Sequence, residues 1–524
     1  ILCVCDIFIL INAMAPKRKI NDKHRIFKED WTEIFIFYQT QWFWSNVASC
    51  VLIIIVTCVA SGESILCDTC TCRNSVINCT ENGMMNILDL WDHTEIVNNA
   101  TIMHFNYNGI VHVKQLPPSK VSYLSFRKNK INKIDEMAFM NLEFLLELDL
   151  SYNSLTAESL NPDIFKINYE DISKPGRLIH LRLDYNNIHS LLPHTFKELS
   201  NLVSLTLSGN PLTVIDRSTS FALSSLPMLK ILSLSNTSLH ELPDHLLHTP
   251  RFLEILNLSN NKFTQIPQGL EEAHALQKLN FNSNPIKSIL NFPKMASLTV
   301  LHLSHMPELN NIGPHAFSLL NVLEEFHCAH NNKLESIDPT AFSYKFNEGL
   351  EGELWPPIKK LDLSYNALGY LDSRLLGRWD TLEELNLQGN KWICDCVNQW
   401  LVSTLAPMVK SNHPEFLNDF TCQVPIEMSG ISILDLDHRH YHMRCLDFYN
   451  NRPERDGILL IGILIGVILT VPFTMGIMIC CAKRKNSLSY YHRIFNQNKS
   501  PYVQDYQLRE TSIYQPTSII NEGY

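Results

Sequence analysis

The sequence predicts an α/β solenoid: a curved stack of short parallel strands with a concave sheet, disulfide-closed ends and one transmembrane helix. Three observations predict it. A leucine pattern recurs at 145–155, 178–188, 253–263 and 358–368. Cysteines gather at both ends of the repeated segment, and an uncharged apolar stretch follows the second group. A chain of 524 residues is also too long for one ordinary core, which agrees with a repeat array.

The recurring pattern has the form LxxLxLxxNxL, and most of its steps are 21–27 residues long. Two longer steps cross 156–177 and 341–357. A period of about 20–29 residues with this pattern is that of the leucine-rich repeat. The asparagine-type positions are Asn108, Asn129, Asn153, Asn186, Asn210, Thr237, Asn261, Asn284, Met306, Asn331, Asn366 and Asn390.

Alternation such as Leu148-Asp149-Leu150 predicts a short strand with leucine on one face. One such strand cannot bury that face alone, so neighbouring repeats stack into a parallel sheet with a continuous leucine core. The amide of Asn153 and its equivalents is expected to bond backbone groups inside the turn. Recurring phenylalanines are expected to fill the convex side: Phe139, Phe196, Phe221, Phe317 and Phe342.

The first 62 residues are interpreted as a leader with a secretory signal at 47–60, cleaved near Ala60–Gly62. Upstream lysines and arginines favour this interpretation, and an uncleaved signal-anchor is the alternative. The first methionine is Met14, so residues 1–13 are expected to be untranslated sequence or part of a fragment.

The second apolar segment, 457–482, carries no charge and is long enough to cross a hydrocarbon core of about 30 Å. The basic run 483–485 follows it, which predicts a single-pass type I protein of the plasma membrane with an extracellular ectodomain. The expected divisions are the leader 1–62, an N-terminal cap 63–99, about 12 repeats in 100–392, a C-terminal cap 393–446, a linker 447–456, the helix 457–482 and a tail 483–524.

The segments "CDTCTCRNSVINC" (67–79) and "CDCVNQW" (394–400), with Cys422 and Cys445, resemble the cysteine-rich flanks of extracellular leucine-rich repeat proteins. The resemblance implies that the flanks pair first with third and second with fourth; a zinc site is the alternative for the first segment. The implied disulfides are Cys67–Cys72, Cys70–Cys79, Cys394–Cys422 and Cys396–Cys445. Cys328, at a leucine position, is expected to be a buried free thiol.

The whole chain resembles single-pass leucine-rich repeat membrane proteins of the Capricious and Tartan type, and Toll ectodomains without the Toll signalling domain. This resemblance implies a cell-surface receptor or adhesion protein that binds a protein ligand in cell–cell recognition. The alternatives are an accessory innate-immune receptor without its own signalling domain and a matrix-binding structural protein. No catalytic motif, cofactor or resident metal is indicated, and the net charge of −10 disfavours a nucleic-acid partner.

The non-leucine positions of the early strands are the expected ligand contacts, because tyrosine and arginine are common anchors in protein interfaces. The candidates are Tyr123, Arg127, Glu147, Asp149, Tyr152, His180, Arg182, Asp184 and Tyr185. Glycosylation sequons begin at Asn78, Asn99, Asn236 and Asn257, and Asn498 is expected to remain bare in the tail.

Histidines form two groups. His302 and His305 occupy the same repeat positions as His327 and His330, so each pair should stack on adjacent strands. A second group lies in "DHRHYH" (437–442). Surface histidines, a zinc site and a pH sensor are the open interpretations of both groups.

The apolar helix contains a GxxxG pattern at Gly462 and Gly466, which predicts a homodimer. Cys480 and Cys481 at its cytoplasmic end are candidates for palmitoylation. The tail segment "YHRI", from Tyr491 to Ile494, resembles an internalisation signal. Tyr502 and Tyr506 lie in a candidate phosphorylated docking segment.

Overall fold

The structure is a computed structural model of the chain, described here for residues 65–88, 91, 94–166, 177–345, 352–412, 419–446 and 453–496. The predicted leader and signal, 1–62, lie outside the described residues. So do Asn498, Tyr502 and Tyr506 of the predicted tail.

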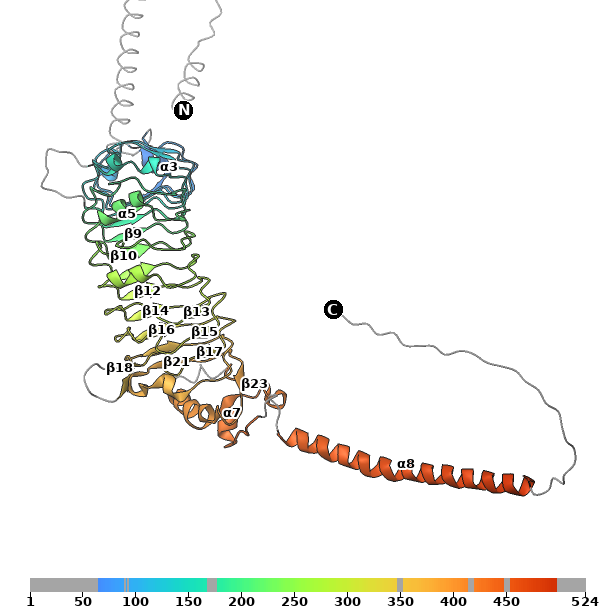
Figure 1. Cartoon of the computed structure of the whole chain (residues 1–524). Coiled ribbons are helices and arrows are strands. Elements are labelled where there is room, and N and C mark those ends of the chain that lie inside the picture. The colour runs from blue at the N-terminus through green and yellow to red at the C-terminus, as the bar shows by residue number, and fades with distance from the viewer. Residues whose placement is uncertain are drawn as a thin grey trace, which may run out of the picture. The chain divides into compact units, whose positions relative to one another are not determined.

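A 14-stranded sheet links the repeats in chain order (Figure 1). Strands β2 to β16 of this sheet pair parallel and in register, so that Leu148 lies beside Leu124 and Leu181. The first strand differs, since β1 is antiparallel to β2. The strands are β1 Thr71–Arg73, β2 Val76–Asn78, β3 Ile102–His104, β5 Tyr123–Ser125, β7 Glu147–Asp149, β8 His180–Arg182, β9 Ser204–Thr206, β10 Ile231–Ser233, β11 Ile255–Asn257, β12 Lys278–Asn280, β14 Val300–His302, β16 Glu325–His327, β20 Lys360–Asp362 and β21 Glu384–Asn386.

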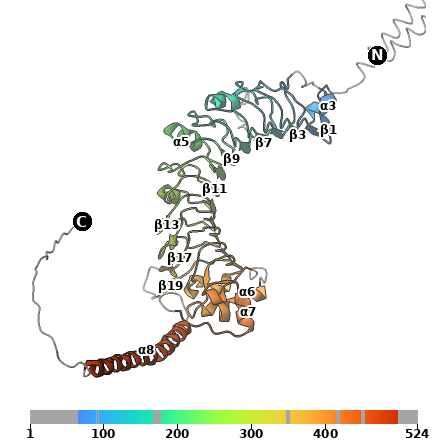
Figure 2. The same cartoon turned by 90° about the vertical axis from the view of Figure 1, so that its right-hand side faces the viewer.

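The chain divides into two compact units. The first comprises residues up to 333 with 340–361 and 377–382, and the second comprises 334–339, 362–376 and the residues from 383 onward. Within the first unit the strands stack along a bend and lie on its inner side (Figure 2). The predicted class, a leucine-rich repeat solenoid with a parallel sheet, is confirmed.

Leucines of the repeat pattern form the core. Leu148 is 1% exposed and Leu150 is fully buried. Four of the five phenylalanines predicted to fill the convex side are buried: Phe139, Phe196, Phe317 and Phe342. The prediction is wrong for Phe221, whose side chain is 57% exposed. It lies in helix α5 (Arg217–Ser224), which turns Ala222 and Leu223 inward instead.

The repeat asparagines bond the backbone of two successive turns, as expected. The amide nitrogen of Asn153 donates to the carbonyl oxygens of Phe126 and Leu150, both at 3.0 Å. Its oxygen accepts from the backbone N–H of Ile131 at 3.0 Å. Where Met306 replaces asparagine, its sulfur stands in for the amide oxygen and accepts from the N–H of Asn284 at 3.4 Å.

The residue immediately before each asparagine-type position has left-handed backbone geometry. This backbone conformation, which favours glycine, is adopted here by residues of many types. Because the same turn recurs, these residues form a row along the repeats within each compact unit. The row comprises Tyr107, Lys128, Tyr152, Tyr185, Gly209, Asn236, Asn260, Ser283, His305, His330, Tyr365 and Gly389.

Short elements complete the repeats on the side opposite the sheet. The helices there are α4 Glu95–Asn98 and α5, with 3-10 turns η1 Glu158–Leu160, η2 Pro162–Phe165, η4 Gln268–Glu272, η5 Ser373–Leu376 and η6 Trp379–Thr381. Two-residue strands form three small sheets: β4 His112–Val113 with β6 Lys133–Ile134, β13 Ser288–Ile289 with β15 Asn311–Ile312 and β17 Ser336–Ile337, and β18 Tyr344–Lys345 with β19 Glu353–Leu354.

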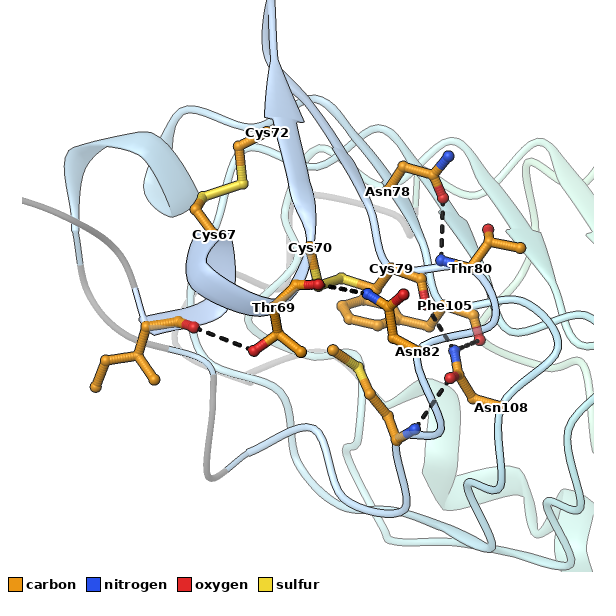
Figure 3. The surroundings of a disulfide bond; sticks show 12 residues. Cys67, Thr69, Cys70, Cys72, Asn78, Cys79, Thr80, Asn82, Phe105 and Asn108 are labelled. Carbon is orange, nitrogen blue, oxygen red and sulfur yellow. Dashed lines mark hydrogen bonds between the residues drawn. A yellow bond between two sulfur atoms is a disulfide. The ribbon is translucent and has the colours of Figure 1, made fainter.

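The N-terminal cap contains helix α3 (Ile65–Thr69) and strands β1 and β2, held by disulfides Cys67–Cys72 and Cys70–Cys79 (Figure 3). Asn82 reinforces the cap, since its amide donates to the carbonyl oxygen of Thr69 at 2.7 Å (Figure 3). These cysteines are therefore disulfide-bonded in the structure and do not form the alternative zinc site.

The C-terminal cap is built on strands β22 (Trp392–Ile393) and β23 (Cys422–Val424). Disulfides Cys394–Cys422 and Cys396–Cys445 tie it together. All four disulfides join the cysteines that the resemblance implied. The remaining elements are the π-helix η7 Leu401–Leu405, α6 Ala406–Asn412, η9 Ile426–Met428 and α7 Ile433–His438.

One long helix, α8 (Pro453–Asn496), follows the C-terminal cap in the chain (Figure 1). Its segment Gly457–Ser487 is long and apolar enough to cross a membrane, with a mean hydropathy of 2.6 in an 18-residue window. Among the residues that the structure describes, this is one candidate span, and it contains the predicted segment 457–482.

Candidate functional site

Strands β5, β7 and β8 bring most of the predicted contact residues together. Their register aligns Tyr123, Glu147 and His180 in one row across the sheet. The next outward row contains Asp149 and Arg182, which are direct partners across β7 and β8. Arg127, Tyr152, Asp184 and Tyr185 follow the strands, in the turns that lead to the repeat asparagines.

Two of the predicted contact residues hold the turns in place. Asp149 is only 4% exposed, and its carboxylate accepts from the N–H of Ser151 at 2.9 Å. The carboxylate of Asp184 accepts from the hydroxyl of Thr206 at 2.6 Å and from the N–H of Ser208 at 2.9 Å. The expectation of an accessible side chain therefore does not hold for Asp149, because its own turn uses the carboxylate.

The aromatic candidates form a stack. The rings of Tyr152 and Tyr185 lie 4.4 Å apart at an angle of 16°. The guanidinium of Arg127 lies 4.3 Å from the centre of the Tyr152 ring and donates to the hydroxyl of Ser151 at 3.2 Å. Stacking of this kind fixes side chains that would otherwise lose rotamer entropy on binding.

Sequence reasoning missed two members of this stack, Tyr107 and Lys128. The ammonium of Lys128 lies 4.7 Å from the Tyr107 ring centre and 5.5 Å from that of Tyr152. The signal that would have found them is their place directly before Asn108 and Asn129, where the recurring left-handed turn puts them in one row.

The candidates on the strands differ in accessibility. Arg182 is exposed, whereas Tyr123, Glu147 and His180 are half-buried. Tyr123 contacts His104 of the preceding strand, with ring centres 5.3 Å apart. Burial lowers the pKa of His104, so this ring is neutral at physiological pH.

The predicted histidine pairs are stacked. His302 and His327 lie 4.6 Å apart at 13°, and His305 and His330 lie 4.7 Å apart at 3°. Burial lowers the pKa of His302, and the charge of His327 lowers it further. No group of three or more histidine, cysteine, aspartate or glutamate side chains that could hold a metal ion occurs among the described residues.

The remaining sequence candidates lie apart from the stack. Cys328 is a buried free thiol, and its sulfur accepts from the amide of Asn331 at 3.2 Å. In the second histidine group, His438 contacts the ammonium of Lys410 at 3.2 Å. Cys480, Cys481 and Tyr491 are exposed along α8, and Ile494 falls within the same helix.

The four sequons are distributed unevenly over the surface. Asn78 is exposed on β2, and Asn99 is exposed beside Lys120, whose ammonium donates to it at 2.8 Å. Asn236 is exposed in the turn row, and Asn257 is half-buried on β11. No further sequon occurs between Asn99 and Asn236, the stretch that contains the stack.

The known proteins that this chain resembles are repeat proteins. The family model "Leucine rich repeat" matches residues 176–231 and 227–286. CD180 antigen of Mus musculus is 27% identical over 327 residues, which are 60% of this chain and 42% of that protein. Lumican of Bos taurus is 31% identical over 301 residues, which are 53% of this chain and 74% of that protein. The chain spans less than half the length of CD180 and of bovine asporin, at 42% and 38%.

Two solved structures are similar at lower identity. One is a chain of the octameric complex of Latrophilin 3, Unc5D and FLRT2, with a TM-score of 0.47, 19% identity, and coverage of 70% of this chain and 96% of that chain. The other comes from the TLR13–ssRNA13 complex, with a TM-score of 0.44, 20% identity, and coverage of 67% and 55%. Together the family model, the lumican match and the repeat structure establish that this chain belongs to the leucine-rich repeat family.

Proposed function

We propose that this chain is a cell-surface receptor or adhesion protein that binds a protein ligand on the early repeats, in cell–cell recognition. The observation that carries the proposal is the stacked set of Arg127, Tyr152 and Tyr185. Tyrosine and arginine dominate the energetics of protein interfaces when they are held rigidly. A pre-organised stack reduces the entropy lost on association, which is the property a binding face needs.

The sequons support the same location. A glycan at Asn78 or Asn257 would occupy the sheet before or after the stack, because these residues lie on β2 and β11. Strands β3 to β9 between them contain no sequon. Glycans at the predicted sites would thus leave one uninterrupted surface, and that surface contains the stack.

The proposed topology is single-pass and type I, at the plasma membrane. Helix α8 supplies a candidate span, and the basic run 483–485 near its end favours a cytoplasmic position there. Disulfide-bonded caps fit an oxidising extracellular compartment. Gly462 and Gly466 support a homodimer, since two glycines four positions apart on one helix allow a second helix to approach closely.

Two other functions are compatible with the relatives. Similarity to CD180 antigen is compatible with the second candidate, an accessory innate-immune receptor that passes a captured ligand to a signalling partner. Similarity to lumican favours a matrix-binding structural protein. Both would also use the ectodomain as a binding surface, so the kind of ligand captured separates them from cell–cell recognition.

The test is a two-colour cell-clustering assay with the full chain on non-adhesive cells. Expressing cells are expected to cluster with a second, labelled cell population, and the double variant His180→Glu/Arg182→Glu on β8 should reduce clustering. The variant Lys278→Glu on β12 is the matched control, because it alters an exposed strand residue of the same sheet far along the repeats. Absence of clustering at normal surface level would contradict cell–cell recognition, and capture of matrix or microbial material would favour an alternative.

A further inference from the structure

A continuous strip of stacked side chains runs along the turns of four successive repeats. We call Tyr107, Lys128, Tyr152 and Tyr185 the tyrosine–lysine row. Each member bonds the next repeat through its backbone: the N–H of Tyr107 donates to the carbonyl of Arg127 at 2.9 Å, and that of Lys128 donates to Ser151 at 3.0 Å. The backbone that carries the row is thus held by the hydrogen bonds between successive repeats.

The faces of the tyrosine rings contact other members of the row or the neighbouring Arg127. Tyr152 has Tyr185 on one side and the cations Arg127 and Lys128 near its ring, and Lys128 also approaches Tyr107. At the far end, Gly209 is so close to Tyr185 that a Cβ there would lie 2.5 Å from the ring. The ring edges and hydroxyls therefore face solvent, with Tyr107 45% and Tyr185 44% exposed.

The cations in this strip have no carboxylate partner among the described residues. No ion pair within the described part of the chain involves Arg127, Lys128 or Arg182, although Lys230 and Lys359 each pair with a glutamate at 2.7–2.8 Å. A cation held over aromatic rings is positioned there by its attraction to the ring faces, without a carboxylate of its own. Such a cation favours a carboxylate brought by a partner.

We propose that the tyrosine–lysine row, with Arg127, recognises an acidic, extended segment of a partner protein. This proposal rests on the proposed function and adds the chemical character of the partner segment. With strands about 4.8 Å apart, the row spans roughly 15 Å, a length that about four or five extended residues cover. Ring edges and hydroxyls would contact the segment's backbone, and the two cations would hold its carboxylates.

A densely sulfated polysaccharide fits this strip less well. The cations are few, and carboxylates occur in the same repeats: Glu147 on β7, and Asp184 directly before Tyr185. These would repel a ligand of uniform, high negative charge. A protein segment with only a few acidic side chains avoids that repulsion.

The experiment selects 12-residue peptides from a displayed library on the full chain in nanodiscs. We expect enrichment of aspartate and glutamate. The selected peptides should bind the double variant Arg127→Gln/Lys128→Gln about tenfold more weakly or worse, because charged pairs with desolvated partners dominate such interfaces. The variant Lys262→Gln/Lys278→Gln removes two exposed charges elsewhere on the repeats and should change binding less than about twofold.

The exchange Arg127→Lys/Lys128→Arg keeps both charges and should retain binding, which distinguishes charge recognition from a folding defect. Peptides without acidic enrichment, or unchanged binding by Arg127→Gln/Lys128→Gln, would overturn the proposal. The proposal would also be overturned if a heparin dodecasaccharide bound more tightly than the selected peptides and Arg127→Gln/Lys128→Gln abolished that binding. Cell clustering that persists at full strength in this variant would reject the acidic partner and leave the proposed function standing.

Discussion

The ring of Tyr185 lies flat against Gly209 of the following repeat, so that a Cβ on Gly209 would be 2.5 Å from Cδ1 of the ring. The same relation recurs between Tyr365 and Gly389, where the corresponding distance is 2.4 Å. In both pairs the glycine has a left-handed backbone and follows the tyrosine in the turn row. Glycine in one repeat thus leaves space for the tyrosine ring of the preceding repeat.

We expect Gly209→Ala to lower the free energy of unfolding by about 1–2 kcal/mol from backbone strain, and further because the Tyr185 ring must move. Gly83→Ala is the matched control, since Gly83 also has a positive φ angle but has no atom within 4 Å of a Cβ. Denaturant unfolding of the two variants measures the difference. Equal destabilisation would show that Tyr185 does not press on Gly209.

The buried asparagines are expected to be individually important for stability. Asn129 donates to the carbonyls of Phe105 and Phe126 at 2.8 and 2.9 Å. Asn129→Ala would leave the backbone N–H of Ile110 unpaired and would remove one of the two amide donors from each carbonyl, so it should cost about 1–3 kcal/mol. Asn132→Ala removes an exposed asparagine of the same repeat and should cost less than about 0.5 kcal/mol. Similar urea midpoints for the two variants would contradict the assigned role.

Most of the fold could be predicted from the sequence because the repeat period fixes which side chains share a face. Leu148 and its equivalents fall in register, and a strand too short to bury leucine alone must stack on its neighbours. The cysteines at the two ends could be placed as caps for the same reason. Phe221 departs from the pattern because a local helix, α5, sets which of its residues face inward.

The contact face was only partly predictable. The alternation of apolar and polar residues shows on which face of the sheet a side chain lies, but it does not show how exposed that side chain is. Glu147 and Asp149 share a face by period, but a carboxylate two residues before a free N–H folds back onto it. The same bond recurs between Asp362 and Ser364 at 3.1 Å. Hydrophobic periodicity does not place Lys128 beside Tyr107 and Tyr152, because their approach depends on the left-handed turn; only the position directly before each repeat asparagine indicates it.

Acidification is expected to destabilise the repeats. The pKa of His302 and of His104 is lowered in the folded chain from the usual 6.5. Between each lowered pKa and 6.5 the unfolded chain binds a proton that the folded chain does not, so stability falls as the pH drops through this window. Burial is the main cause for His302; His327 and Lys278 act in the same direction, and Glu325 opposes them.

The measurement is the thermal midpoint of the full chain in nanodiscs at pH 7.5 and 5.5. The midpoint should fall on acidification, and His302→Gln should reduce that fall because glutamine does not titrate. His438→Gln, an exposed change in the C-terminal cap, should leave the fall unaltered. If His302→Gln and the native chain respond identically, His302 does not contribute to the pH dependence.

Helix α8 offers a built-in reporter for the proposed homodimer. Eighteen residues separate Gly462 from Cys480, which is about five turns at roughly 3.6 residues per turn, so both lie on one face of the helix. Cys480 and Cys481 are exposed free thiols. If two copies pack through Gly462 and Gly466, oxidation of the full chain in membranes should link them through Cys480 in preference to Cys481.

We therefore expect Cys481→Ser to retain the cross-linked dimer and Cys480→Ser to lose most of it. Gly462→Val should also reduce the dimer, because a branched side chain prevents close helix approach. Gly457→Val is the matched control: it adds the same bulk on the same helix but lies nine positions before Gly466, about two and a half turns at roughly 3.6 residues per turn, and so on the opposite face. Hydroxylamine treatment before oxidation frees any palmitoylated thiol. Equal cross-linking of the native chain, Gly462→Val and Gly457→Val would rule out packing through this face.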